Sequence, residues 1–326
     1  MFAENKRASV KKSLTLAGST LGFSLVAVMA TAQPSGIATD LANALVEGQE
    51  NFELQPFVEN KSVDYSIGAV NRFLSDQSGK MVGGNWKYLD LSIGTEAGEP
   101  SFDAKSVYGL KETKNWFLFN QTSLGHYNSR TTANLGLGAR HINDAETVIL
   151  GVNAFYDYEM KSGHKRASIG GEFLTSIGQI RANQYKAISG DIVYDGGTES
   201  ALDGTDVKFT FELPYFYGSD IYYKYTHWYD SSFDDYRNEF GATAEIAPDL
   251  TLKIAGYDSS DSGNDTIASL SYSIPLGGQT REAKVKRDGN FSTALKPIRE
   301  MLYIPVEREN RIMKKTVKLG VTYSGY

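Results

Sequence analysis

A histidine close to three carboxylates is the grouping in this sequence that most suggests chemistry. His227 is followed by Asp230, Asp234 and Asp235. An imidazole among carboxylates can bind a metal ion or serve as the base of a surface protease. The alternative interpretation is a polar residue at the end of a strand, next to an acidic loop. The sequence contains no G-x-S-x-G, H-E-x-x-H or P-loop motif, so we expect neither an enzyme nor a cofactor.

A second acidic grouping lies in the stretch DSSDSGND, with carboxylates at Asp258, Asp261 and Asp265. Calcium prefers oxygen ligands, but the spacing of an EF-hand loop is absent. We therefore interpret this stretch as a solvated loop, or as one that bridges surface lipid phosphates through divalent ions.

The segments that must position these residues alternate between apolar and polar positions with a period of two. In the stretch TANLGLGARHI (132–142), the two sets fall on opposite faces of an extended strand. We expect one face to contact lipid and the other to face a lumen. The lipid set is Ala133, Leu135, Leu137 and Ala139, and the lumen set includes Gly136, Gly138 and Arg140. Glycine on the lumen face leaves room for a segment inside a barrel, or lets the wall curve.

Twelve such segments, most of them about ten residues long, predict an all-β fold: an antiparallel transmembrane β-barrel. The even strand number and the aromatic residues near strand ends favour an outer-membrane barrel over a secreted sandwich. The expected strands span 85–94, 104–112, 114–123, 130–142, 147–158, 165–175, 178–188, 203–213, 219–229, 236–246, 249–258 and 264–275.

The connections between these segments alternate between two kinds. The tight ones are 112–114, 143–146, 176–178, 214–218 and 247–248, and the longer or acidic ones are 95–103, 124–130, 159–165, 189–204, 230–236 and 258–265. Such alternation is typical of short periplasmic turns and longer outer loops.

The composition restricts the class of protein. The 326 residues allow one or two domains, and the absence of cysteine excludes disulfides and thiolate metal sites. The net charge of −6 argues against nucleic acid as a partner, because a phosphate-binding surface needs a basic excess.

The N-terminal region predicts export. Positive residues precede an uncharged apolar run and an A-x-A cleavage site before Gln33, so we expect residues 1–32 to be a secretory signal peptide rather than a membrane anchor. Residues 33–84 hold two short helix candidates, at 38–48 and 66–76, and are interpreted as a short periplasmic extension.

Several stretches resemble the inverse autotransporter β-domain of the intimin and invasin family. They are NLGLGARHI, VILGVNAFYDYEMKSGHKRASIGGEF, ALDGTDVKFTFELPYF and YIPVERENRI, within residues 60–315. The resemblance implies a twelve-stranded outer-membrane barrel over 85–276, with its N-terminus in the periplasm. It also implies a linker, 277–326, that threads the lumen toward the cell surface and carries an adhesive passenger outside.

The resemblance further implies contacts and partners. Linker charges are expected to pair with charges on the lumen wall, because unpaired buried charge is costly. The linker charges are Glu307, Arg308, Glu309 and Arg311, and the wall candidates are Arg140, Asp157, Lys208, Glu212 and Glu245. The implied partners are outer-membrane lipids, the barrel assembly machinery and periplasmic chaperones, and a host or surface receptor where a passenger exists.

Two features depart from the family pattern. Residues 33–84 contain no recognisable glycan-binding module, and the chain stops at Tyr326 without immunoglobulin-like repeats. We therefore expect a translocator and anchor whose adhesive passenger is largely absent. Two alternatives stay open: a stand-alone porin-like barrel, since twelve strands can enclose an aqueous lumen, and an outer-membrane enzyme built on the histidine group.

Overall fold

The computed structural model describes residues 85–213, 218–247, 249–275, 294–318 and 321–325. The expected signal peptide and the N-terminal extension with its two helix candidates lie outside the described residues. Within the described ranges, none of the helices has the length and apolar character needed to span a membrane.

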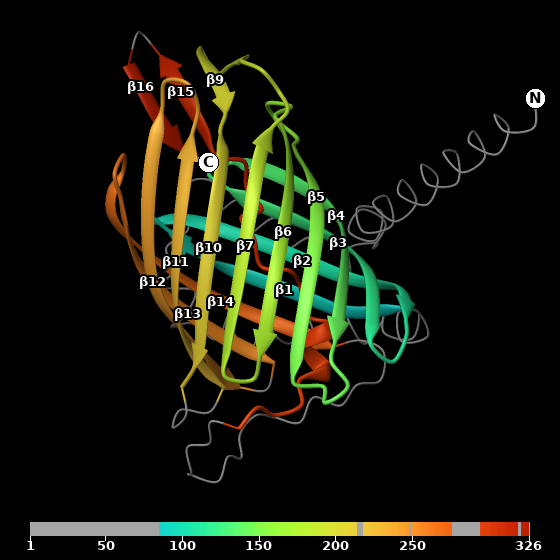
Figure 1. Ribbon diagram of the computed structural model, residues 1–326. Helices are drawn as coiled ribbons and strands as arrows, with labels where there is room; N and C mark the ends of the chain where they lie inside the picture. The colour runs from blue at the N-terminus through green and yellow to red at the C-terminus, as the bar shows by residue number, and fades with distance from the viewer. Residues whose placement is uncertain (1–84, 214–217, 248, 276–293, 319–320, 326) are drawn as a thin grey trace, which may run out of the picture. The chain divides into compact units, whose positions relative to one another are not determined.

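Twelve antiparallel strands form a closed barrel (Figure 1). They are β1 (Trp86–Glu96), β2 (Glu99–Glu112), β3 (Trp116–Tyr127), β4 (Arg130–Ile142), β5 (Val148–Glu159), β6 (Lys165–Thr175), β7 (Gly178–Ala187), β10 (Asp203–Glu212), β11 (Ser219–Tyr229), β12 (Asp234–Ala247), β13 (Leu250–Ser259) and β14 (Gly263–Pro275). Pairing of β1 with β14 closes the sheet, so the barrel has no free edge and its backbone groups are satisfied within the wall. The all-β, twelve-stranded barrel expected from the sequence is confirmed.

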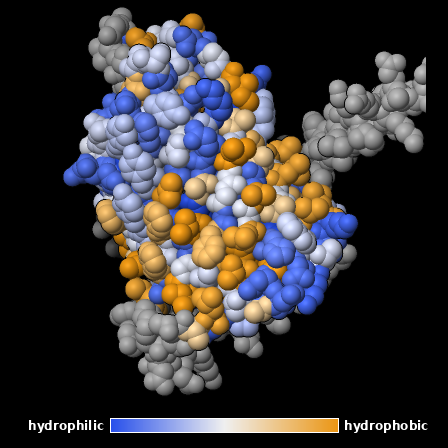
Figure 2. All heavy atoms as spheres, in the orientation of Figure 1, coloured by the Kyte–Doolittle hydropathy of each residue, from blue (hydrophilic) through white to orange (hydrophobic). Residues whose placement is uncertain are grey.

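Burial alternates along the strands, as the period-two pattern predicts. On β5, every second residue from Leu150 to Tyr158 is exposed, and those between are buried. On β4 the two expected sets also lie on opposite sides of the wall, since Leu137 is 55% exposed and Arg140 is 0% exposed. Figure 2 shows hydrophobic side chains over the middle and lower wall, and a mostly hydrophilic end around β9, β15 and β16. The wall is thus apolar outside and polar inside.

The glycines on the lumen face of β4 make room for aromatic rings. A Cβ atom on Gly138 would lie 2.2 Å from the ring of Phe119, and one on Gly136 would lie 2.2 Å from the ring of Phe155. Both rings belong to neighbouring strands and are buried. The space beside these glycines is therefore filled by the wall itself, and not by a threading segment as the sequence suggested.

The connections at one end of the barrel are tighter than expected. Only Ala97–Gly98 separates β1 from β2, and only Asn128–Ser129 separates β3 from β4; all four residues have positive φ. The expected long loops at 95–103 and 124–130 are therefore wrong. Polar residues there still pair as strands, because strand pairing continues beyond the apolar band into water, and two positive-φ residues suffice for a hairpin.

A second, four-stranded sheet lies at that same end. It consists of β8 (Ile192–Tyr194), β9 (Gly197–Ala201), β15 (Lys314–Lys318) and β16 (Val321–Gly325), in the order β16-β15-β9-β8. Part of the expected loop 189–204 is thus a hairpin, and it pairs with the C-terminal segment. A single turn of 3₁₀ helix, η1 (Arg299–Leu302), precedes that segment's passage through the barrel.

Candidate functional site: the segment inside the barrel

Residues 294–313, the lumenal segment, run inside the barrel from one end to the other (Figure 1). The segment starts at the end where β4 turns into β5. There the backbone N–H of Ile298 donates to the Glu146 carbonyl (2.7 Å), and the N–H of Lys296 donates to Ser176 Oγ (2.9 Å). The Arg299 guanidinium donates to the Glu146 carboxylate (2.8 Å), and this hydrogen bond lowers the pKa of Glu146.

Apolar side chains hold the first part of the lumenal segment. Leu302 and Val306 are almost fully buried, within one cluster that also contains Phe117 and Phe119 of β3. The Tyr303 ring meets Phe117 edge-to-face, with 5.1 Å between centroids. Burying these side chains stabilises the threaded arrangement through the hydrophobic effect, which contributes about 1.5–3 kcal/mol for each large side chain.

Arg140 fixes the backbone of the segment rather than its charges. Its Nη1 donates to the carbonyls of Leu302 (2.9 Å) and Ile304 (2.6 Å), while its Nε and Nη2 donate to the Glu172 carboxylate (2.8 and 3.0 Å). Gln121 adds a similar contact, because its Oε1 accepts the Val306 N–H (2.6 Å). Wall side chains thus satisfy both carbonyls and an N–H of a segment that forms no ladder of its own at this level.

Charged pairs hold the middle of the segment. Arg308 donates to both carboxylate oxygens of Asp157, at 2.9 and 2.7 Å, and Arg166 donates to the same carboxylate (2.8 Å). Lys208 and Glu307 form an ion pair at 2.5 Å. Asp157, Arg166 and Arg308 have side chains with 0% exposure. Such desolvated, bidentate pairs favour one position of the segment over all others.

Glu309 and Arg311, the next charged residues of the segment, contact strands β11 and β1. Arg311 pairs with Glu96 of β1 (2.6 Å) and with Glu309 (3.2 Å), and Lys224 of β11 lies 3.6 Å from the Glu309 carboxylate. The Tyr185 hydroxyl accepts the Glu309 N–H (2.7 Å). The segment is therefore held from several strands around the barrel.

The structure brings together only part of the expected set. It pairs Arg308 with Asp157 and Glu307 with Lys208, whereas Arg140 contacts backbone carbonyls. Glu245 accepts the backbone N–H of Asp249 (3.3 Å), and Glu212 lies half-buried near the end of β10.

An apolar cluster and an ion pair hold the segment where it leaves the barrel. Met313 packs in a cluster with Tyr185, Leu202 and Trp228, and the Leu202 N–H donates to the Met313 carbonyl (2.9 Å). Lys314 pairs with Glu159. Beyond this point, β15 adds to β9 as a strand, with Lys314 opposite Ala201.

His164, in the connection between β5 and β6, lies close to the Lys314–Glu159 ion pair. Its Nε2 is 3.6 Å from a carboxylate oxygen of Glu199, which in turn pairs with Arg130. Burial, and then the nearby Lys314 ammonium, lower the pKa of His164. Outside the barrel mouth, burial would raise the pKa of Asp230, but its ion pair with Lys315 outweighs this and lowers it.

Sequence reasoning missed many wall residues that hold the segment. Those that contact the segment directly are Glu96, Gln121, Asn134, Arg166, Arg181, Tyr185 and Lys224. Behind them, Glu172 and Arg237 pair with Arg181 and Glu96, and at the exit Glu159 pairs with Lys314 and with Arg130, which also pairs with Glu199 of β9. The available signal was the strand period itself. On β6, for example, Arg166 and Glu172 alternate with Ala167, Ile169 and Phe173, which places both charges on the lumen face.

The histidine group considered for chemistry is dispersed. His227 contacts Asp234 on the outer wall and stacks on Tyr236 (4.2 Å between centroids), whereas Asp230 pairs with Lys315. The carboxylate of Asp235 is buried and accepts the Ser259 hydroxyl (2.8 Å). In the described part of the chain, no three metal-ligating side chains lie close enough together to hold a metal ion.

Comparisons with known proteins agree with this geometry. The family model "Inverse autotransporter, beta-domain" matches residues 49–310. Intimin from Citrobacter freundii is 30% identical over 39% of this chain and 14% of its own length. Inverse autotransporter adhesin YeeJ from Escherichia coli K12 is 26% identical over 65% of this chain and 10% of its own length.

A solved structure from a study of in-meso crystallisation of membrane proteins supports the fold. It covers 71% of this chain and 100% of its own, with a TM-score of 0.62 and 18% identity. The alignments with curated relatives span only 10% to 37% of those proteins' lengths.

Proposed function

The chain belongs to the inverse autotransporter β-domain family and provides its outer-membrane barrel, and we propose that this barrel carries its own C-terminal segment through the lumen to the cell surface. One observation carries the proposal: hydrogen bonds and ion pairs hold the lumenal segment over its whole passage, from Ile298 at one end to Met313 at the other, beside the Lys314–Glu159 ion pair.

The topology supports an outward direction of passage. With an even number of strands, the start of β1 and the end of β14 lie at the same end of the barrel, which is also where the lumenal segment starts. That end carries the short turns at 113–115, 143–147 and 176–177. The longest connection between barrel strands, residues 188–202 with β8 and β9, lies at the other end. Longer loops are typical of the extracellular side, so in this proposal the segment runs outward and β15 and β16 lie on the cell surface.

We extend this proposal to the remaining parts of the chain. Residues 1–32 act as a signal peptide, 33–84 stay in the periplasm, 85–276 form the barrel and 277–326 form the linker. Assembly requires the general barrel assembly machinery and periplasmic chaperones. The activity is anchoring and display without catalysis, and any adhesion, together with its receptor, belongs to a passenger.

The porin-like alternative is weaker because the lumen is occupied. A segment that buries Arg308 and Leu302 inside the barrel stands in the path that solutes would take. In planar bilayers we expect small conductance from the full chain, and a larger one from a variant that lacks residues 294–326. Equal conductance of the two proteins would restore the porin interpretation.

The test of the proposal is the position of the C-terminus. An epitope tag placed after Tyr326 is probed with antibody on intact cells and again on permeabilised cells. Labelling of intact cells is expected. Labelling only after permeabilisation would contradict outward threading. A tag in the 160–164 connection, expected outside by the same topology, serves as the matched control.

A further inference from the structure

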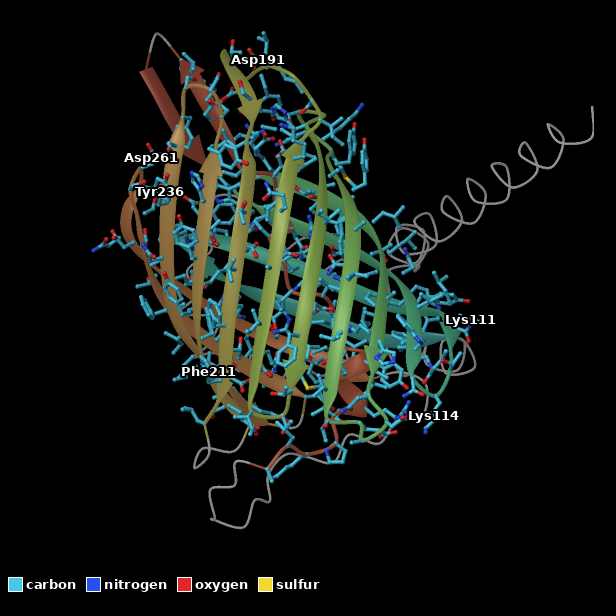
Figure 3. The ribbon with its side chains drawn as sticks, in the orientation of Figure 1. Lys111, Lys114, Asp191, Phe211, Tyr236 and Asp261 are labelled. Carbon is cyan, nitrogen blue, oxygen red and sulfur yellow. The ribbon has the colours of Figure 1, made fainter. Side chains whose placement is uncertain are left out.

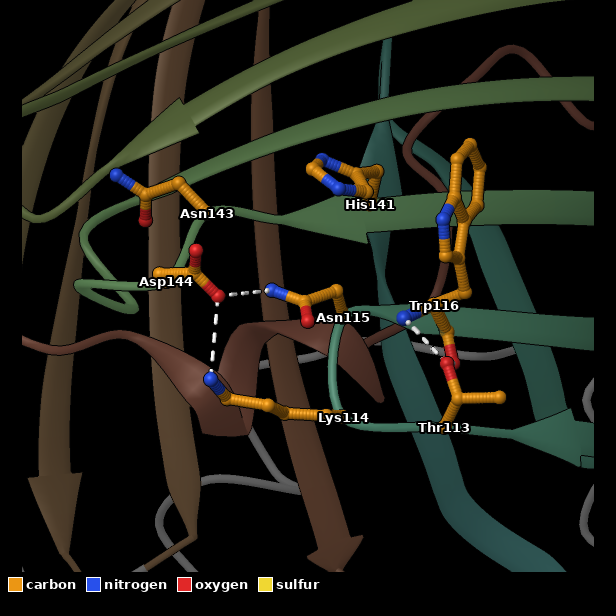
Figure 4. Close-up of a pocket in the computed structure, with 7 residues that line it drawn as sticks. All are labelled: Thr113, Lys114, Asn115, Trp116, His141, Asn143 and Asp144. Atoms are coloured by element: carbon orange, nitrogen blue, oxygen red, sulfur yellow. Dashed lines mark hydrogen bonds and ion pairs between the residues drawn. The ribbon is translucent and has the colours of Figure 1, made fainter.

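An open pocket of about 530 Å³ lies on the outer wall, between the β2–β3 and β4–β5 turns (Figure 4). Lys114, Asn115 and Asp144 come from the turns, and Trp116 and His141 from the adjoining strands. None of these residues takes part in holding the lumenal segment through its side chain. The pocket is therefore separate from the site that holds the lumenal segment.

The pocket lies where the apolar wall ends. Trp116 is 52% exposed, and Leu118, two residues along the same face of β3, is 39% exposed. His141 is the register partner of Trp116 on one side and of Leu150, which is 55% exposed, on the other. Leucines on one side and polar turns on the other mark the level at which acyl chains give way to headgroups.

Hydrogen-bond donors at this level are available. Within the described ranges, the indole N–H of Trp116 and the ring nitrogens of His141 have no hydrogen-bond partner, and the two rings meet at 4.8 Å between centroids. Lys114 is 3.2 Å from Asp144, but these side chains are 73% and 83% exposed, so the pair is weak and exchangeable.

A second lysine lies on the same outer face, outside the lining of the pocket. Lys111 is exposed and pairs in register with Leu118, so it lies on the same outer face. Figure 3 shows Lys111 and Lys114 at the end of the barrel opposite Asp191. The Lys114 ammonium, the His141 imidazole and the Trp116 indole N–H thus line one opening at headgroup level, and Lys111 lies on the same outer face beyond it. All of these groups can donate to an anion.

We propose that this pocket binds the phosphodiester headgroup of a membrane phospholipid. Lys114, His141 and Trp116 donate to the phosphate oxygens, and the acyl chains lie against Leu118 and Leu150. The proposed orientation of the barrel places the pocket at the periplasmic leaflet, and this choice of leaflet rests on the proposed function. The chemistry of the site does not depend on the orientation, because it follows from the donors and the apolar wall alone.

The experiment uses the full chain purified in a neutral detergent, with dihexanoyl phosphatidylglycerol as the probe. Native mass spectrometry counts bound lipid for the wild type and for the double variant Lys111→Gln, Lys114→Gln. We expect the double variant to bind about tenfold more weakly, because two charged donors are lost. The matched control is the double variant Lys165→Gln, Lys186→Gln, which removes two exposed lysines at the other end of the wall.

Two further probes identify what is recognised. Dihexanoylglycerol, which lacks the phosphate, should not bind at the same concentration, and inorganic phosphate should not compete. Trp116→Phe keeps the ring and removes the N–H, and should weaken binding of the phospholipid. Equal loss in both lysine double variants, or competition by inorganic phosphate at equal concentration, would overturn the proposal. Neither result bears on the position of the C-terminus, so the two proposals fail independently.

Discussion

Arg308 and Asp157 form a two-pronged ion pair in the middle of the barrel, although they are 151 positions apart in the chain. Both side chains have 0% exposure. Arg166 donates to the same carboxylate, and the Asn134 amide donates to its other oxygen (2.7 Å). One wall carboxylate therefore joins the lumenal segment to β4 and β6.

Replacing Asp157 by Asn should destabilise the threaded barrel strongly. The substitution leaves Arg166 and Arg308 buried without their counter-charge, which costs about 3–5 kcal/mol for a buried pair. Urea unfolding in lipid vesicles measures this cost. Asp144→Asn removes an exposed partner of Lys114 and should change stability by about 0–1 kcal/mol. Similar losses in the two variants would show that the buried pair does not hold the segment.

Replacing Leu137 by Arg tests which side of the wall meets lipid. Leu137 is 55% exposed and lies centrally on β4. An arginine at mid-bilayer depth should destabilise the barrel by about 2–4 kcal/mol. The comparison is Val193→Arg, since Val193 is 81% exposed on β8 outside the barrel; its effect should stay within about 0.5 kcal/mol. An unchanged unfolding curve for Leu137→Arg would contradict the facing assignment.

Replacing Gly138 by Leu should disturb the lumen, because the first added carbon already meets the Phe119 ring at 2.2 Å. Overpacking of this kind costs about 1–3 kcal/mol. Removing the ring with Phe119→Ala in the same protein should recover part of the lost stability. The double-mutant cycle measures this coupling, and purely additive effects would mean that the close approach does not explain the glycine.

The stability of the barrel mouth should fall as the pH falls through 6.5. Burial and Lys314 lower the folded-state pKa of His164, so the unfolded state binds the proton more tightly. Stability is therefore lost between the unfolded value of about 6.5 and the lower folded value, and no further loss from this group follows below it. The groups facing His164 are Glu159 and Glu199, which favour its protonation, and Lys314 and Arg130, which oppose it.

Thermal unfolding of the wild type and of His164→Gln, measured from pH 8 to pH 4, checks this prediction. The difference between their midpoints should change in this window, with the wild type losing more as the pH falls. Parallel curves for the two proteins would assign the acid sensitivity to other groups.

The sequence by itself determined which side chains of the barrel wall face outward and which face the lumen. Period-two alternation places Leu137 outside and Arg140 inside, because successive side chains of any strand point to opposite faces. The twelve strands follow from the same local rule and from turn residues between the runs. The family resemblance added that residues after the last strand belong in the lumen.

Only the tertiary structure decided which groups meet there. Arg140 satisfies carbonyls of the segment and Glu172, and not the charges expected for it. The partner of a lumen side chain depends on strand stagger and on the path of a segment more than a hundred residues away, neither of which leaves a periodic signal. The hairpin β8–β9 likewise gains its strand partner only when β15 arrives beside it, since two short strands alone are marginal in water.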